Sequence, residues 1–442
     1  MVDMRRRALA AVLLSAALLA AGCSGSSDPG AADDSALSPA DPAKVSGEIT
    51  VLTNRTDQVT DGTMQKYADL FNKDYPHVKV KFEGVTDYEG EVKIRMNTDK
   101  YGDVLLIPNS VVTADYPKFF ASLGGAADLD AKYTAAGTGK GKVGDKVYGL
   151  AGFSFINGFV YNKDVWTAAG VTTWPTTPAE FLTGLQAIKD KTGATPYYTN
   201  YKDGWPLSSW SSVLGSATCD AKANDKLPTG NPWAPGSDLN TGDTLLYDIV
   251  KNKLSESDPT TTNWEDSKGL LATGKIATMW LGSWSLAQMQ DAAKKAGKNP
   301  ESIGYMPFPA QVGGKFCSVV APDYQSAVNI HSPNKAAARA WIDWILEKSD
   351  TAAVNQAVSA LKGAPLPSAL KPFTDAGVQF IDLSQADSAK VSQIDNLSEV
   401  GISKPEYRQH LIDVARGAGK GDLNTIFADL AKKWSEAAKN LG

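Results

Sequence analysis

Apolar and polar positions along the chain follow patterns that predict strands and helices in turn. Residues 49–53 and 78–82 have the β-branched or alternating apolar pattern of strands, and the apolar stripe across residues 64–71 predicts an amphipathic helix between them. Residues 103–108 contain a continuous apolar run, as in a strand buried within a parallel sheet. With a short helix expected at 88–96, this strand–helix–strand–helix–strand series predicts an α/β fold.

A second series of elements begins near Gly158, with a strand at 159–161 and a helix over 162–169. Thr177-Pro178-Ala179-Glu180 is a capping box with proline at the first helical position, so a helix is expected to begin there. Further along, the pattern predicts a strand at 276–280, the tight turn Gly282-Ser283-Trp284, and helices at 285–296, 335–348 and, on either side of 417–421, within 404–442.

Polar side chains follow two strands of the first series. Asn54 and Arg55 come directly after the first strand, and Asn109 comes after the strand at 103–108. Because open α/β sheets bind ligands at the carboxyl ends of their strands, we expect these residues on a ligand-facing edge. Each of them could equally be a turn former.

The N-terminus has the composition of a secretory signal peptide over residues 1–22. Three arginines at 5–7 precede the apolar run 8–21, which is shorter than the roughly 20 residues of a membrane span. Leu18–Cys23 also resembles the bacterial lipobox, in which the cysteine is lipidated and becomes the first residue of the mature protein. We therefore expect a lipid anchor at Cys23; the alternative is a plain secreted protein.

Residues 23–46 are expected to form a flexible linker behind that anchor. The segment is built from Ser, Gly, Asp, Ala and Pro and holds few large apolar residues, so it cannot bury enough surface to offset its ordering entropy. The folded body is then expected at the extracytoplasmic face of the cell membrane. In that oxidising compartment Cys219 and Cys317 are expected to form a disulfide; the alternative is two buried free thiols.

Composition and charge exclude several classes of function. The chain has 442 residues, 43% of them hydrophobic and 21% charged, as in globular proteins. Its net charge is −5 and no basic block lies outside the first ten residues, so nucleic acid is not an expected partner. Three histidines and three cysteines leave little material for zinc or haem. We therefore expect neither a metal site nor a cofactor.

Two glycine-rich segments resemble nucleotide-binding motifs only superficially. Residues 139–144 match G-x-G-x-x-G but precede an extended segment, and residues 269–275 nearly match a P-loop but have Ile276 where a magnesium-binding Ser or Thr is required. The sequence shows neither an H-E-x-x-H nor a G-x-S-x-G motif. None of these motifs therefore supplies a candidate catalytic residue.

The order of several short motifs resembles the carbohydrate-type extracellular solute-binding proteins of ABC importers, the maltose-binding-like group. The matches run from about Glu48 to the C-terminus, so they cover nearly the whole mature chain. They are the segments 67–76, 102–106, 147–150, 161–164, 175–181, 274–279, 282–284 and 332–337.

This resemblance implies a periplasmic-binding-protein-like α/β fold of two lobes joined by a hinge, with the ligand in the cleft between them. By position, the chain is expected to cross between lobes near Asn157, Gln311 and Pro365. Lobe 1 then comprises residues 47–157 and 313–365, and lobe 2 comprises 158–312 and 366–442.

The resemblance also implies which residues line the cleft. Trp284 matches a tryptophan that stacks on a sugar ring in related proteins, and Trp205 falls where the family has another cleft aromatic. Where relatives often have a Gly-Gly loop, this chain has Pro322-Asp323-Tyr324-Gln325. Asp323 and Tyr324 are therefore expected to bind ligand alongside Asn54, Arg55 and Asn109.

The resemblance implies a protein that captures a sugar and is not an enzyme, and the aromatic residues assigned to the cleft favour an oligosaccharide. The expected partners are the permease subunits of an ABC importer and, through the lipid anchor, the membrane. The protein itself is expected to be a monomer. A lipid-anchored carbohydrate-active hydrolase is the alternative, because two carboxylates suffice for glycoside hydrolysis. A surface adhesin is a third possibility.

Overall fold

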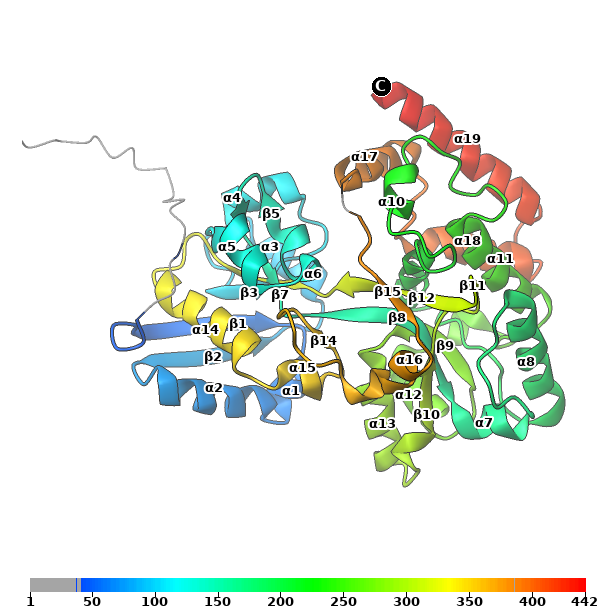
Figure 1. Ribbon diagram of the computed structural model, residues 1–442, viewed down its shortest axis with the longest axis horizontal. Helices are drawn as coiled ribbons and strands as arrows, with labels where there is room; N and C mark the ends of the chain where they lie inside the picture. Colours follow the sequence, from blue (N-terminus) through cyan, green and yellow to red (C-terminus); the bar gives the residue numbers. More distant parts are fainter. Residues whose placement is uncertain (1–36, 38–40, 385) are drawn as a thin grey trace, which may run out of the picture. The chain divides into compact units, whose positions relative to one another are not determined.

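The computed structural model describes residues 37, 41–384 and 386–442 (Figure 1). The expected signal peptide, Cys23 and most of the expected linker (23–36 and 38–40) lie outside the described residues. In the part of the chain that is described, no helix combines the length and apolar character needed to span a membrane.

The first sheet has the strand order β2-β1-β3-β13-β7. Strands β1 (Gly47–Thr53), β2 (Val78–Gly84) and β3 (Val104–Leu106) are parallel, as the strand–helix alternation predicted. β13 (Gln325–Val328) runs antiparallel between β3 and β7 (Leu150–Ala151), so a much later segment completes the sheet.

Helices cover both faces of the first sheet because side chains alternate along its strands. Ile49 and Val51 face α2 (Thr63–Asp74) and α14 (Lys335–Glu347), whereas Leu52 and Leu105 belong to the core under α3 (Tyr88–Arg95) and α4 (Tyr116–Phe119). The apolar stripe of α2 is buried as predicted.

The second sheet is built around β8 (Phe153–Asn162), which pairs with β9 (Thr278–Gly282), β10 (Ile303–Met306) and β12 (Lys315–Pro322). Its outer strands are β11 (Gln311–Val312), β14 (Val358–Ser359) and β15 (Gln379–Ile381). One face packs on α7 (Lys163–Ala168), α8 (Pro178–Lys191), α11 (Asp238–Lys251), α18 (Pro405–Ala415) and α19 (Leu423–Leu441), and the other on α12 (Trp264–Ala272), α13 (Ser285–Lys295) and α16 (Lys371–Asp375) (Figure 1).

The capping box predicted at the start of α8 is present in altered form. Thr177 Oγ1 accepts a hydrogen bond from the Glu180 backbone N–H at 3.1 Å, as the motif requires. The Glu180 carboxylate accepts instead from the backbone N–H of Thr176 at 2.7 Å. The reciprocal bond is therefore shifted by one residue, and the helix start is still doubly capped.

The chain passes between the sheets at positions that differ from two of the three expected ones. β7 ends at Ala151 and β8 begins at Phe153, so the first passage is at Gly152 and not near Asn157, which pairs with Gly282 inside the second sheet. The second passage is at Asp323 and Tyr324, between β12 and β13.

The expectation of a crossing near Gln311 was wrong because a hairpin keeps the chain in the second sheet. Gly313 and Gly314 have φ of 59° and 75°, the left-handed pair that a two-residue hairpin needs between β11 and β12. Residues 313–322 therefore belong with the second lobe. At the third passage β14 already pairs with β8 of the second sheet, although Leu361 after it still packs on the first core and Leu370 packs on the second. The passage therefore extends from β14 to Leu370 and includes Pro365.

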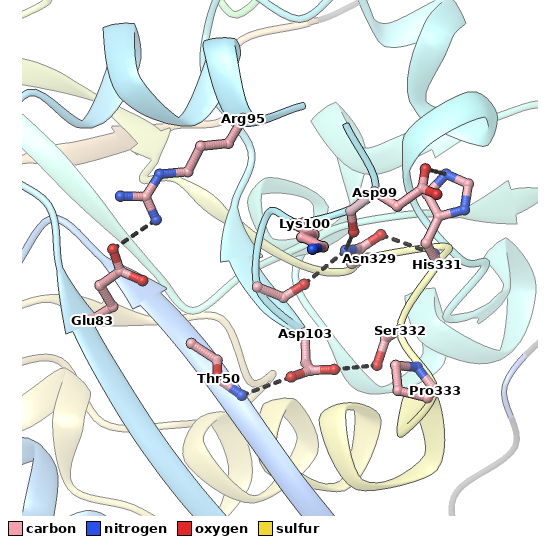
Figure 2. A pocket seen from close by; sticks show the side chains of 11 residues that line it. Thr50, Glu83, Arg95, Asp99, Lys100, Asp103, Asn329, His331, Ser332 and Pro333 are labelled. Atoms are coloured by element: carbon pink, nitrogen blue, oxygen red, sulfur yellow. Dashed lines mark hydrogen bonds and ion pairs between the residues drawn. The ribbon is translucent and has the colours of Figure 1, made fainter. Parts of the chain in front are cut away.

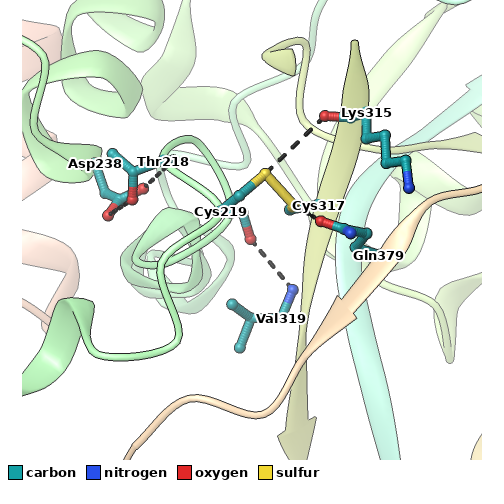
Figure 3. Close-up of a disulfide and its surroundings, with 8 residues drawn as sticks. Thr218, Cys219, Asp238, Lys315, Cys317, Val319 and Gln379 are labelled. Carbon is teal, nitrogen blue, oxygen red and sulfur yellow. Dashed lines mark hydrogen bonds between the residues drawn. A yellow bond between two sulfur atoms is a disulfide. The ribbon is translucent and has the colours of Figure 1, made fainter. Parts of the chain in front are cut away.

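A disulfide joins Cys219 and Cys317, 98 positions apart in sequence (Figure 3). Cys317 lies on β12, and Cys219 lies in the loop that follows a 3-10 turn at Ser209–Val213. The bond therefore ties the strand that leads into the second passage to a loop of the second lobe.

The remaining elements are short and complete the two lobes. They are α1 (Thr56–Thr60), β4 (Gly124–Gly125), α5 (Ala126–Lys132), α6 (Ala135–Thr138), β5 (Lys142–Val143), β6 (Lys146–Val147), α9 (Trp205–Ser208), α10 (Ala223–Lys226), α15 (Thr351–Val354) and α17 (Ser388–Ser398).

Candidate ligand-binding site

Three tryptophans form a cluster of exposed and half-buried rings on the second lobe. Trp205 and Trp284, both expected from the sequence, have ring centroids 5.8 Å apart at 41°. Trp264 joins them, 5.0 Å from Trp205 at 78° and 5.7 Å from Trp284 at 70°. We call Trp205, Trp264 and Trp284 the tryptophan cluster. The Trp264 ring stands steeply to the other two rings, which are tilted by 41° to each other.

The cluster arises because three chain segments run in parallel and end at the same edge. Residues 195–198 bridge in parallel to Ile276, just before β9, and to Ser255 on their other side. Each segment is followed by a helix that starts with a tryptophan: Trp205 opens α9, Trp264 opens α12, and Trp284 is the N-cap of α13. The carboxyl ends of parallel segments are where α/β proteins bind ligands.

Trp284 occupies its place because Gly282 has no side chain. A Cβ on Gly282 would lie 2.4 Å from Nε1 of the Trp284 indole, so the ring rests directly on the glycine backbone. The Gly-Ser-Trp turn singled out in the sequence is therefore a seat for the indole. Trp205 is the more open ring of the cluster, with 39% of its surface exposed.

Trp264 was missed in the sequence, although a local signal marks it. Asn263 caps α12 by accepting from the Asp266 backbone N–H at 3.0 Å, and Glu265 and Asp266 fill the first turn. A tryptophan at the N-terminus of a helix, as at Trp284, was the pattern to extend. Lys268 Nζ lies 5.0 Å from the centroid of the Trp264 ring.

On the first lobe, polar side chains collect at the carboxyl ends of the parallel strands. Asn54 is exposed directly after β1. Arg55 is half-buried and is held by Asp57, whose carboxylate it contacts at 2.7 and 2.9 Å, and by Asn355 at the end of α15. The Arg55 guanidinium is therefore fixed by two partners of its own lobe.

Glu89 connects the other residues expected on this edge. Its carboxylate Oε1 accepts from the Tyr324 hydroxyl at 2.7 Å and from both the backbone N–H and the amide of Asn109 at 3.0 Å. Lys140 donates to Asn109 Oδ1 at 2.8 Å. Glu89 therefore brings Asn109 and Tyr324 together, and Lys140 joins the group through Asn109. Sequence reasoning missed Glu89 and Lys140 because a local pattern does not show which side chains meet across distant segments.

Asp323 lies between these charges, at the passage between the sheets. Removal of its carboxyl from water raises its pKa to about 6, although the Tyr324 backbone N–H and the nearby Arg55 and Lys140 favour the ionised form. Desolvation also raises the pKa of the Tyr324 phenol, and Glu89 adds to that effect. The first-lobe edge therefore combines carboxylates, amides, a phenol and two cations whose charges largely offset one another.

A cavity elsewhere on the first lobe contains none of these residues (Figure 2). It measures about 250 Å³ and is lined by paired charges, including the Arg95–Glu83 ion pair at 2.7 Å and the His331–Asp99 contact at 3.4 Å.

Within the described ranges no group of three or more His, Cys, Asp or Glu side chains is placed to hold a metal ion. Residues 139–144 pass through a 3-10 turn into β5, so the glycine motif leads to a strand.

Comparison with known proteins defines the class to which this fold and site belong. Residues 56–352 match the family described as bacterial extracellular solute-binding protein. The chain belongs to this family. Among curated proteins, it is 25% identical to a multiple sugar-binding protein of Streptococcus mutans over 334 residues, covering 72% of this chain and 75% of the relative.

Two solved structures from Bifidobacterium animalis subsp. lactis share the fold closely. BlMnBP1, the binding protein of an ABC transporter in complex with mannobiose, is 30% identical with a TM-score of 0.83 over 90% of this chain and 96% of that chain. BlMnBP2, a manno-oligosaccharide specific solute binding protein in complex with mannotriose, is 30% identical with a TM-score of 0.82 over the same shares.

Proposed function

We propose that the protein captures a short oligosaccharide and delivers it to an ABC importer. The observation that carries the proposal is the tryptophan cluster, because sugar rings offer apolar C–H faces that stack on flat indoles. The steep angle between the Trp264 ring and the other two rings suits a ligand with more than one sugar ring. The relatives whose names state a sugar support the same class of ligand.

The first-lobe edge suits a neutral ligand rich in hydroxyl groups. Hydroxyls both donate and accept, so they can bond to the carboxylates, amides and cations gathered at Glu89, Asn109, Asp323 and Arg55. Because the Arg55 and Lys140 cations already interact with carboxylates of the same lobe, a ligand with a net charge gains little there. We propose a ligand of two or three hexose units, with mannobiose and mannotriose the first candidates.

Several finer features are part of the same proposal. The protein acts as a monomer, is not an enzyme, and is held at the extracytoplasmic face by a lipid on Cys23. The hinge lies at Gly152, at Asp323–Tyr324 and between β14 and Leu370, where the chain passes between the sheets. The ligand is bound between the first-lobe edge and the tryptophan cluster.

The test is a thermal-shift screen of the mature protein against a panel of mono-, di- and trisaccharides. A ligand present at 100 times its dissociation constant adds about 2.7 kcal/mol to stability and raises the melting temperature. Calorimetric titration of each active sugar then gives the affinity. A panel without any shift contradicts the proposal, and release of monosaccharide during incubation would indicate the hydrolase instead.

A further inference from the structure

The tryptophan cluster is held together by two loops that are distant in sequence. Trp205 ends the loop 199–205 and Trp264 ends the loop 256–264, yet their rings meet edge to face at 5.0 Å. The relative position of these rings therefore depends on how the two loops are attached to each other. Four side-chain contacts make that attachment.

The most direct contact is made by Asp203. Its carboxylate Oδ2 accepts from the backbone N–H of Trp264 at 2.8 Å, and its backbone carbonyl accepts from the N–H of Trp205 at 2.8 Å. One residue therefore bonds the backbones of both tryptophans. The side chain itself reaches across from the first loop to the second.

The base of the same pair of loops is fixed by Glu256. Its carboxylate oxygens accept from the buried Thr199 backbone N–H at 3.1 and 3.0 Å, and the Thr199 hydroxyl also donates to it. Between the two ends, Thr262 Oγ1 accepts from the Lys202 backbone N–H at 2.8 Å, and the Tyr198 hydroxyl accepts from the Asn263 N–H at 3.1 Å.

The loop 199–205 has a conformation that needs such attachment. Asn200 has a φ of 55°, in the left-handed region, and its buried Oδ1 has no hydrogen-bond partner among the described residues. A left-handed residue and an unsatisfied amide oxygen both cost free energy, so surrounding contacts must over-determine this loop. Asp203 and Glu256 supply those contacts at its two ends.

We propose that Asp203 and Glu256 are positioning residues that preassemble the tryptophan cluster before the ligand arrives. Their carboxylates lock loop 199–205 to loop 256–264, so the rings of Trp205 and Trp264 keep the geometry that receives the sugar. A preassembled site does not have to order its side chains during binding, and affinity rises accordingly. The proposal rests on sugar binding as the function of this cluster.

The test compares Asp203→Ala with Asp203→Asn, because asparagine keeps an oxygen that can accept from the Trp264 N–H. Near-ultraviolet circular dichroism of the unliganded protein reports the tryptophan geometry, and calorimetric titration with the best sugar of the panel reports affinity. We expect Asp203→Ala to change the aromatic spectrum and weaken binding about tenfold, one decade corresponding to about 1.4 kcal/mol. Asp203→Asn should restore both signals.

Asp266→Ala is the matched control, because Asp266 is also an acidic residue and lies in the first turn of α12 near the cluster. Its contact with the Asn263 cap is made by its backbone N–H, which the substitution keeps. It should leave the aromatic spectrum and the affinity unchanged. Thr262→Val is a milder second variant, because it removes one acceptor between the loops with little change in volume. It should change the aromatic spectrum and weaken binding, each to a smaller extent than Asp203→Ala. If Asp203→Ala does not fold, Thr262→Val takes its place in the test.

The proposal is overturned if Asp203→Ala folds with an unchanged aromatic spectrum and unchanged affinity. It is also overturned if Asp203→Asn loses affinity as Asp203→Ala does while keeping the wild-type spectrum, because Asp203 would then contact the sugar itself. Failure of the wild type to bind any sugar refutes the proposed function. The unliganded spectra of the same variants would still decide whether Asp203 positions the rings.

Discussion

At the scale of single residues, the seat of the Trp284 indole on Gly282 leads to a prediction about a residue that need not touch the ligand. Because a Cβ at position 282 would lie 2.4 Å from the indole, Gly282→Ala must displace the ring. We expect this variant, like Trp284→Ala, to weaken sugar binding by about 1–3 kcal/mol, the range for losing an aromatic contact. Calorimetric titration measures the loss.

Gly269→Ala is the control for this substitution. Gly269 lies in α12, and a Cβ there meets nothing within 4 Å, so the added methyl group should leave the affinity unchanged. Wild-type affinity in Gly282→Ala would mean that the Trp284 ring does not need its present position to bind sugar.

Asp323 leads to a second prediction at this scale, which concerns pH. Burial raises its pKa from 3.8 to about 6, so the folded protein holds this proton more tightly than the unfolded chain does. Its contribution to the free energy of unfolding is therefore greatest below about pH 4 and decreases as the pH rises through 6. Asp323→Asn should remove this decrease, as urea unfolding at pH 4, 5, 6 and 7 would show.

The comparison for this prediction is the difference between the two pH profiles. The wild type should lose stability relative to Asp323→Asn between pH 4 and 6, and the difference should be constant above pH 7. Parallel profiles across the whole range would show that Asp323 titrates alike in the folded and unfolded chains.

The residue scale is also where the sequence was least informative about the site. Asn109 and Tyr324 were predicted because one follows a strand and the other departs from a family pattern, and both donate a hydrogen bond to the Glu89 carboxylate. Glu89 joins them from α3. Sequence periodicity cannot tell whether a carboxylate on the surface of a helix contacts a loop or only water. Tertiary contacts of this kind are absent from local patterns.

At the scale of elements, the disulfide makes the second lobe depend on a covalent bond. Closing a loop of 98 residues restricts the unfolded chain, and loss of such a bond typically costs about 2–5 kcal/mol. We expect the double variant Cys219→Ser, Cys317→Ser to lower the free energy of unfolding by that amount. Denaturant unfolding with and without reductant measures it.

Reductant provides the internal control for the disulfide. It should destabilise the wild type to the level of the double variant and leave the double variant unchanged. Equal stability of the wild type in both conditions would show that the bond contributes nothing to the folded state.

The elements themselves were predictable wherever the pattern was local. Residues 64–71 mark α2, and the capping box marks α8. Strand pairing was not predictable, because β13 inserts beside β3 from more than 200 positions away and the Gly313-Gly314 turn returns the chain to the second sheet. Consequently two of the three expected crossing points were misplaced, although the lobes were recognised.

At the scale of the whole molecule, anchoring is a prediction that the sequence alone carries. If Cys23 is lipidated after removal of residues 1–22, Cys23→Ser should move the protein from the membrane fraction to the medium or soluble extract. Fractionation and immunoblotting measure this. The double variant Cys219→Ser, Cys317→Ser is the control and should remain in the membrane fraction, and membrane association of Cys23→Ser would contradict the anchor.

Ligand binding should also close the two lobes, because the chain passes between them at only a few points. Gly152 and the pair Asp323–Tyr324 link the sheets as short extended segments, the kind of connection about which lobes rotate. A sugar that bonds the first-lobe edge and stacks on the tryptophan cluster contacts both lobes in the closed form. It therefore binds that form better and shifts the population toward it.

Small-angle X-ray scattering of the mature protein, with and without the best sugar of the panel, measures this closure. The radius of gyration of the wild type should fall at saturating sugar, whereas Trp284→Ala at the same sugar concentration should remain nearer its unliganded value because it binds more weakly. At a concentration that saturates the variant as well, both proteins should compact. A wild type that binds sugar by calorimetry without compacting would contradict closure of the lobes on binding.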